Sequence, residues 1–169
     1  AEMTHAQSMT CNSLVHISLD ENCQATVGED QILEGSYSNY NIFTVTFTNS
    51  GLPVDLNSGH IGQTLSVTVT GPNNSCWGSI LVEDKLAPTI SCQDVILACN
   101  DPLPESISAS DACGPATVTF QDQVQDNQCN GQYQTIITRT HTAVDGSGNT
   151  AFCVQIISIE RGTLADVVY

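Results

Sequence analysis

Eight cysteines in 169 residues are the feature that most restricts how this chain can fold. They do not occur in the closely spaced Cys or His pairs of zinc sites, so their spacing favours disulfides over metal ligands. Disulfides persist in oxidising compartments, which predicts an extracytoplasmic protein. Residues 1–12 lack the basic and apolar regions of a signal peptide, so we expect a mature chain or a segment of a longer secreted one.

The charge balance argues against two classes of partner. Three Lys and Arg residues stand against eighteen Asp and Glu residues, which gives a formal net charge of −15. Such a chain repels phosphate backbones and anionic lipid surfaces, and it has no local run of Lys or Arg that would offset the repulsion. No apolar run is long enough to cross a bilayer. We therefore expect neither nucleic-acid binding nor direct membrane insertion.

Apolar residues recur with a period of two along most of the chain. The alternation is clearest in residues 14–20, 42–48 and 63–71 of the first half and in residues 116–122 and 132–146 of the second. These segments are rich in Thr, Val and Ile, which favour half-buried antiparallel strands. Clusters of Asn, Asp, Gly and Pro separate them, and no segment carries a sustained helical stripe. The pattern predicts an all-β protein built from sandwich modules.

The two halves of the chain repeat one another. The run "CWGSILVE" begins at Cys76 and the run "CVQIISIE" begins at Cys153, and each has the composition of a closing strand. Charge and proline interrupt two apolar runs at residues 83–88, which places the domain boundary there. We predict two tandem immunoglobulin-like modules and a tail, namely residues 1–86 with an N-terminal linker, residues 87–160, and residues 161–169 as a linker or tail.

Chain direction suggests how four cysteines pair. If the first strand of a sandwich runs parallel to the last, cysteines near the starts of the two strands lie at the same end of the module. This argument predicts Cys11–Cys76 in the first module and Cys92–Cys153 in the second. Each bond would close a loop of about sixty residues, for which the chain-entropy estimate is about 4 kcal/mol.

The other four cysteines leave the connectivity open. We favour Cys99–Cys129, because both residues are expected at turn ends, but Cys113–Cys129 is nearly as good a choice. The first module holds three cysteines and the second holds five. Either a disulfide crosses the boundary, or each module carries a free thiol.

The second half resembles a known family of modules. The segments "DKLAPTISCQDVILACNDP", "SDACGPATVTF" and "TRTHTAVDGSGNTAFCVQIISI" are similar to the HYR-type immunoglobulin-like module, over roughly residues 87–160. The first half, with "CNSLVHISLDENCQATV", looks like the related repeat that precedes such modules in very large secreted surface proteins of gliding and filamentous Bacteroidota. The resemblance implies a tandem segment of a long adhesin or fibre at the bacterial cell surface, exported by the type IX secretion system.

Two departures from the family pattern concern the cysteines. The family often has a cysteine in the turn where this chain has Gly146 or Ser147, and another near residues 37–40, where this chain has none. The resemblance therefore implies that Cys113 and Cys23 are unpaired thiols.

Candidate chemical sites are few. Cys76 lies in "SCWG", which is similar to the signature around a papain-type nucleophile, but the preceding Cys-Gly and a nearby base are missing, so a structural disulfide is the better interpretation. Asp145 and Asn149 are weak Ca²⁺ candidates in the turn "DGSGN", although turn formation alone explains both residues. The four histidines lack the spacing of a zinc site; they are His5, His16, His60 and His141. Apart from a possible Ca²⁺ ion, we expect no cofactor.

Aromatic residues suggest one kind of binding surface. Tyr37 and Tyr40 in "SYSNY" are the better candidates for a surface that stacks on sugars. Trp77 directly follows a strand-opening cysteine, and we expect it to pack in the core or at the boundary between the modules.

Together these features predict a non-enzymatic structural or adhesive segment of an extracellular bacterial surface fibre. Its expected partners are neighbouring modules of the same chain, identical chains in a fibre, and glycans or cell surfaces. The alternative is a carbohydrate- or surface-binding accessory module, which requires an exposed aromatic platform. A secreted hydrolase ranks third, because no convergent acid pair or nucleophile–base set can be assigned.

Overall fold

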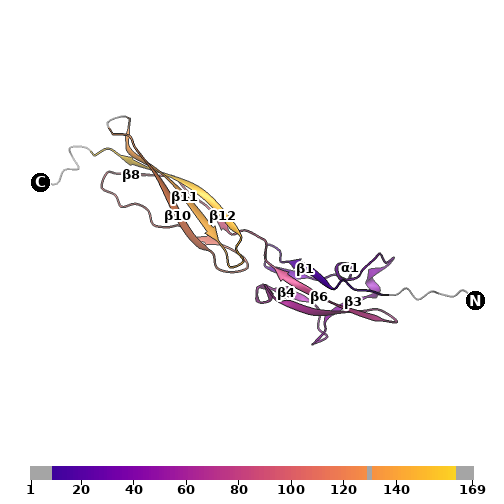
Figure 1. Cartoon of the computed structure of the whole chain (residues 1–169). Helices are drawn as coiled ribbons and strands as arrows, with labels where there is room; N and C mark the ends of the chain where they lie inside the picture. Colours follow the sequence, from indigo (N-terminus) through magenta and orange to yellow (C-terminus); the bar gives the residue numbers. More distant parts are fainter. Residues whose placement is uncertain (1–8, 129–130, 163–169) are drawn as a thin grey trace, which may run out of the picture. The chain divides into compact units, whose positions relative to one another are not determined.

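The computed structural model describes residues 9–128 and 131–162, and its fold is all-β (Figure 1). The chain divides into two compact units, Ala1–Leu86 and Ala87–Tyr169, which we call module 1 and module 2. Helical structure in the described residues is limited to single turns, which are α1 (Glu29–Ile32), η1 (Tyr40–Ile42) and η2 (Ser58–His60). Each module has its own sheets, as expected of an immunoglobulin-like sandwich.

Module 1 is built on a four-stranded sheet in the order β1–β6–β5–β3. Its strands are β1 (Leu14–Ser18), β3 (Thr44–Phe47), β5 (Thr64–Thr70) and β6 (Ser75–Glu83). β1 runs parallel to β6, whereas β5 is antiparallel to both of its neighbours. A second sheet pairs β2 (Gln24–Thr26) with β4 (Asp55–Asn57).

The period-two pattern of module 1 separates a core face from a solvent face. Alternate residues of the large sheet are buried, and they pack with apolar residues of the remaining segments. The buried set includes Ile17, Val45, Val67, Val69, Ile80 and Val82 from the sheet, and Ile32, Leu33, Val54 and Leu56 from elsewhere. The threonines and serines between them point outward.

The start of module 1 crosses its closing strand at Gly78. A β-carbon on this residue would lie 2.3 Å from the carbonyl oxygen of Asn12, so only glycine lets the two backbones approach this closely. Beside the crossing, Cys11 and Cys76 form a disulfide with an S–S distance of 2.04 Å and a sequence separation of 65. The N-terminal segment is therefore bonded covalently to β6.

Module 2 has a longer sheet in the order β10–β11–β12–β8. Its strands are β8 (Val95–Leu97), β10 (Thr117–Asp126), β11 (Tyr133–Val144) and β12 (Thr150–Glu160). β8 runs parallel to β12, and the other two pairings are antiparallel. The facing sheet consists only of β7 (Thr89–Ile90) and β9 (Ala109–Ser110) among the described residues. A disulfide joins Cys92 to Cys153, with a sequence separation of 61.

The core-facing side of the module 2 sheet contains an ion pair between a buried arginine and a partly exposed aspartate. The Arg139 side chain donates to both Asp122 carboxylate oxygens, at 2.7 and 2.8 Å, and to the Pro104 carbonyl oxygen at 2.6 Å. Its Cζ atom lies 3.9 Å from the centroid of the Phe120 ring, as in a cation–π contact. Arg139 is only 2% exposed. Its hydrogen bond to Asp122 lowers the pKa of that carboxyl group and outweighs the effect of burial.

A second polar contact lies next to this ion pair. His141 is fully buried, and its Nε2 atom is 3.3 Å from Oε1 of Gln155. The Gln155 amide donates to the Gln93 carbonyl oxygen at 2.7 Å, which connects β12 to the segment before β8. Polar side chains with hydrogen-bond partners thus occupy core positions of this sheet that aliphatic residues occupy in module 1.

The remaining cysteines differ from the sequence predictions. Cys99 is an exposed free thiol, so the predicted Cys99–Cys129 bond is wrong; Cys129 itself lies outside the described residues. Cys23 and Cys113 are both disulfide-bonded, which corrects the expectation that they are unpaired thiols. A family pattern in the sequence does not determine which sulfur atoms come within bonding distance after folding.

Candidate functional site

The outer face of the module 1 sheet carries hydroxyl groups and one exposed indole. Trp77 is 73% exposed and lies opposite Thr68 on the neighbouring strand. The hydroxyl oxygens of Thr68 and Thr48 are 2.9 Å apart and share a hydrogen bond. A shallow depression of about 400 Å³ borders the indole, and it is lined by Cys11, Ser13, Thr48, Ser66, Trp77, Gly78 and Ser79. The indole face and the hydroxyl groups are therefore available to a ligand or a neighbouring surface.

The position of Trp77 corrects the expectation that it packs in the core or at the module boundary. Side chains alternate along β6, and the disulfide directs Cys76 toward the interior. The next residue must then point outward. The alternation in "SCWGSILVE" already contained this information.

A small charged cluster lies at the end of β6. Glu83 lies 3.1 Å from His16 Nδ1 and 2.6 Å from Lys85 Nζ. Hydrogen bonds, first from Lys85 and then from His16, lower the pKa of the Glu83 carboxyl group. The part of the face around Trp77 consists of uncharged side chains.

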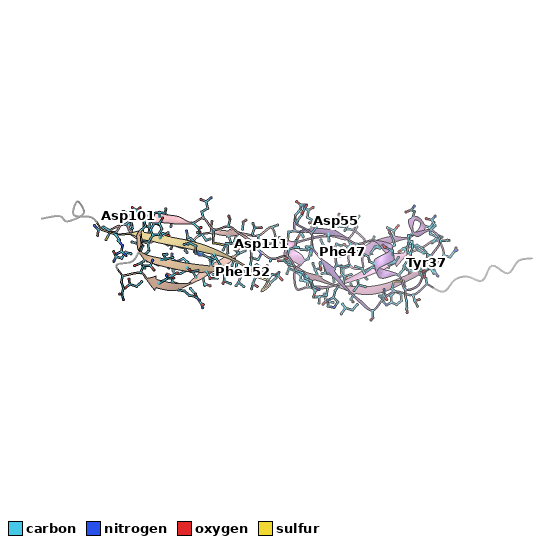
Figure 2. All side chains as sticks on the ribbon, turned by 90° about the horizontal axis from the view of Figure 1, so that it is seen from above. Tyr37, Phe47, Asp55, Asp101, Asp111 and Phe152 are labelled. Carbon is cyan, nitrogen blue, oxygen red and sulfur yellow. A yellow bond between two sulfur atoms is a disulfide. The ribbon has the colours of Figure 1, made fainter. Side chains whose placement is uncertain are left out.

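The outer face of the module 2 sheet is also uncharged and carries an exposed ring. Phe152 projects from β12, is 76% exposed, and lies opposite Thr142 on β11 (Figure 2). Val154 on β12 and Ile96 on β8 are exposed as well. The other outward residues on the described parts of β10 and β11 are mainly Thr and Gln, namely Thr117, Thr119, Gln121, Gln123, Gln125, Thr138, Thr140 and Thr142. Each module thus presents an uncharged area of sheet face around one prominent aromatic side chain.

The two predicted surface tyrosines form a separate cluster in module 1. Tyr37 packs edge-on against Phe43, with ring centroids 5.0 Å apart, and against Tyr40 at 5.9 Å. Both tyrosines are half-buried. A depression of about 200 Å³ lies beside Tyr37 and Phe43 and is bounded on another side by Pro72. Tyr37 therefore lines a small depression, and Tyr40 packs against Tyr37 at its edge without lining the depression itself.

The predicted weak Ca²⁺ ligands build the turn between β11 and β12. Asp145 Oδ1 accepts hydrogen bonds from the Ser147 and Asn149 N–H groups at 2.9 and 2.8 Å. Asp145 Oδ2 accepts a hydrogen bond from the Asn149 side chain at 2.9 Å. Gly148 adopts a φ of +88°, which glycine tolerates. Both carboxylate oxygens thus have partners within the turn.

The same contacts affect the ionisation of Asp145. Burial raises the pKa of its carboxyl group, but hydrogen bonds from the Asn149 side chain and from the backbone N–H groups of Asn149, Ser147 and Gly148 outweigh burial and leave the pKa below its ordinary value. The folded turn therefore favours the ionised form of Asp145.

We expect module 2 to lose stability in acid. The pKa values of Asp122 and Asp145 are both lower in the folded state than in the unfolded chain, so their contribution is present above about pH 4 and is lost as the pH falls through the folded pKa values. Thermal melts followed by circular dichroism between pH 7 and pH 2 would measure this loss. The Asp145→Asn variant should show a weaker dependence on pH, and a wild-type melting temperature that stays constant from pH 5 to pH 2 would contradict the expectation.

The structure does not bring the candidate catalytic groups together. Cys76 is bonded to Cys11 and therefore carries no thiol. His60 Nδ1 accepts a hydrogen bond from the Asn57 N–H at 3.1 Å, and His141 contacts Gln155. His5 lies outside the described residues. The contacts of the described histidines are those of structural residues.

In residues 9–128 and 131–162, no helix has the length and apolar character that crossing a membrane requires.

Comparisons with known proteins give only distant likenesses. No protein-family model matches the chain, and no curated protein matches it. Human mucin-like protocadherin EC1-2 is 11% identical with a TM-score of 0.33, and the match covers 91% of this chain and 98% of that one. DIP-gamma IG1+IG2 is 13% identical with a TM-score of 0.37, covering 91% and 95%. Titin domains I67–I69 are 10% identical with a TM-score of 0.37, covering 90% and 64%. Similarity at this level transfers no ligand or activity to this chain.

Proposed function

We propose that this chain is a structural and adhesive unit of an extracellular fibre. The observation that carries the proposal is the placement of one disulfide in each module, between the segment where the chain enters and the strand that closes the fold. A fibre must bear tension along its chain, and these disulfides lie where tension would pass. The proposal includes no catalytic activity.

The disulfides bypass most of each module. Tension that reaches Cys11 passes through its bond to Cys76 and continues along β6. In module 2, tension passes from Cys92 to Cys153 and along β12. The residues inside these two loops, which have sequence separations of 65 and 61, carry no tension while the disulfides are intact. Each module therefore resists extension even when its hydrogen bonds break.

The sheet faces support the adhesive part of the proposal. Thr, Ser and Gln keep the outer faces hydrated, while Trp77 and Phe152 offer apolar contact area. In a chain with a net charge of −15, uncharged faces are where a similarly acidic surface can approach without repulsion.

We place the fibre on a bacterial cell surface, exported by the type IX secretion system, on the strength of the sequence resemblance. The motif "TRTHTAVDGSGNTAFC" runs through the end of β11, the turn at residues 145–149 and the start of β12. Its Asp, Gly and Asn residues build that turn, and its last residue is the disulfide-bonded Cys153. The motif therefore has a structural explanation that suits a repeated module.

Single-molecule pulling tests the proposal. The chain is held by tethers before Cys11 and after Glu160, and it is stretched with and without a reducing agent. Complete reduction should add about 200 Å of contour length per module, because it releases loops of 65 and 61 residues at about 3.3 Å per residue. Cys99→Ser, which removes only a free thiol, should leave the oxidised trace unchanged. Equal contour lengths with and without the reducing agent would contradict the load-bearing role.

A carbohydrate-binding accessory module is the second candidate. Two observations favour it, namely the depression beside the exposed Trp77 indole and the smaller one beside Tyr37. An array of soluble and insoluble glycans that shows no binding to the native chain would remove this candidate and leave the load-bearing role untouched.

A further inference from the structure

The edge strands of the two large sheets differ greatly in length. In the described residues, β1, β3 and β8 contain five, four and three residues, whereas β10 contains ten. β10 pairs with β11 along its whole length without a register shift. No backbone hydrogen bond between described residues reaches its other edge. β10 therefore presents a long, regular row of N–H and C=O groups to solvent.

The core-facing side of β10 is poorly covered. Phe120 and Val124 pair in register with the buried His141 and Ile137, so they point to the same side of the sheet. They are nevertheless 44% and 65% exposed. The facing strands β7 and β9, of two residues each, do not extend over them. The apolar side chains of β10 would gain cover from an additional strand.

β10 has few of the features that usually protect an exposed edge. Such edges are commonly blocked by Lys, Pro or a β-bulge, and "TVTFQDQVQD" contains none of these. Its two charged residues are Asp122, which is paired with Arg139, and Asp126, which is the last residue of the strand. Most of the edge therefore carries no unpaired charge.

We propose that β10 pairs antiparallel with β10 of a second copy of this chain, which makes one continuous sheet from two copies of module 2. Local charge permits a second copy at this edge, since the uncharged Thr, Val and Gln side chains let two chains of net charge −15 meet without opposing carboxylates. The alternating pattern of β10 is also complementary to itself in a two-fold arrangement.

The side chains indicate a register for this pairing. With Gln121 on the two-fold axis, Val118 lies opposite Val124, and Phe120 lies opposite Asp122. The two valines then cover each other, and every carboxylate within residues 117–125 faces an uncharged residue. If the two-fold axis passed through a residue that brings Asp122 or Asp126 opposite a second aspartate, repulsion between the carboxylates would disfavour the pairing.

Cysteine cross-linking in the full chain tests this register. Gln121→Cys and Gln123→Cys are compared in a Cys99→Ser background, and both altered positions are exposed on the outward side of β10. In the proposed pairing, the two sulfur atoms introduced by Gln121→Cys meet across the axis. Gln123 instead lies opposite Thr119, so the two sulfur atoms introduced by Gln123→Cys are about 13 Å apart. Under mild oxidation, Gln121→Cys should give about tenfold more disulfide-linked dimer than Gln123→Cys, because only its Cβ atoms come within bonding reach.

The controls separate pairing from other effects. The Cys99→Ser parent measures the background from other thiols, and circular dichroism confirms that both variants fold like the parent. Equal dimer yields from the two variants, or no excess of Gln121→Cys over the parent, would overturn the pairing. The inference rests on the proposed fibre function and specifies its lateral contact. If the cross-link fails but reduction still adds the expected contour length in the pulling experiment, only the β10 contact is rejected. If reduction adds no contour length, the load-bearing role itself is rejected.

Discussion

Asp122→Asn should lower the free energy of unfolding of module 2 by about 2 kcal/mol, because it removes the carboxylate that accepts from the buried Arg139 guanidinium, while solvent at the partly exposed Asp122 side screens part of the charge. The remaining partners, the Pro104 carbonyl and the Phe120 ring, do not neutralise the charge. Hydrogen exchange measured by mass spectrometry on peptides from β11 would report the loss separately from module 1.

A matched control exists on the same strand. Asp126→Asn makes the same charge change at an exposed residue and keeps an oxygen that can accept the Gln128 N–H. It should change the unfolding free energy by less than about 0.5 kcal/mol. The double variant Asp122→Leu/Arg139→Met should recover much of the loss, because removing both charges leaves no unpaired ion. An Asp122→Asn variant as stable as the wild type would show that Arg139 does not need its partner.

Removal of the Cys11–Cys76 disulfide should lower the free energy of unfolding of module 1 by about 4 kcal/mol. The bond closes a loop with a sequence separation of 65, and its loss restores the entropy of the unfolded chain. The Cys11→Ala/Cys76→Ala variant would be followed by fluorescence during urea unfolding. Trp77 is the only tryptophan in the chain and directly follows Cys76, so its signal reports on module 1 alone.

The control for this experiment is Cys99→Ser, which alters an exposed free thiol in module 2 and should leave the urea midpoint of the Trp77 signal unchanged. A double alanine variant with the wild-type midpoint would contradict the stabilising role of the disulfide. A midpoint shift of equal size in Cys99→Ser would show that the effect is not specific to the bond.

The strand pattern could be predicted from sequence because it depends on neighbours along the chain. Alternating Val and Thr placed the strands near β3 and β5, and the residues that alternate in sequence are those that separate into core and solvent faces. β10 was expected only as far as residue 122, yet it continues to Asp126. The stretch "DQVQD" has no apolar alternation, and its pairing with β11 is what makes it a strand.

The parts of the candidate site that escaped prediction depend on contacts between distant residues. Arg139 gave no signal in the sequence, because its partner Asp122 lies on another strand and becomes adjacent only in the β10–β11 register. Trp77 and Phe152 are different, since the outward position of each follows from the alternation beside a disulfide-bonded cysteine, Cys76 and Cys153 respectively.

The amino-acid sequence by itself determined that the chain is β-rich, acidic and rich in cysteine, and that it consists of two similar halves, because composition and short-range periodicity are local properties. Chain direction was enough to suggest Cys11–Cys76 and Cys92–Cys153. Only the tertiary structure decided that β10 is a long uncovered edge and that Arg139 is buried against Asp122. Those features depend on the order of the strands and on how much of one sheet the facing sheet covers. Both are set by contacts between residues that are distant in sequence.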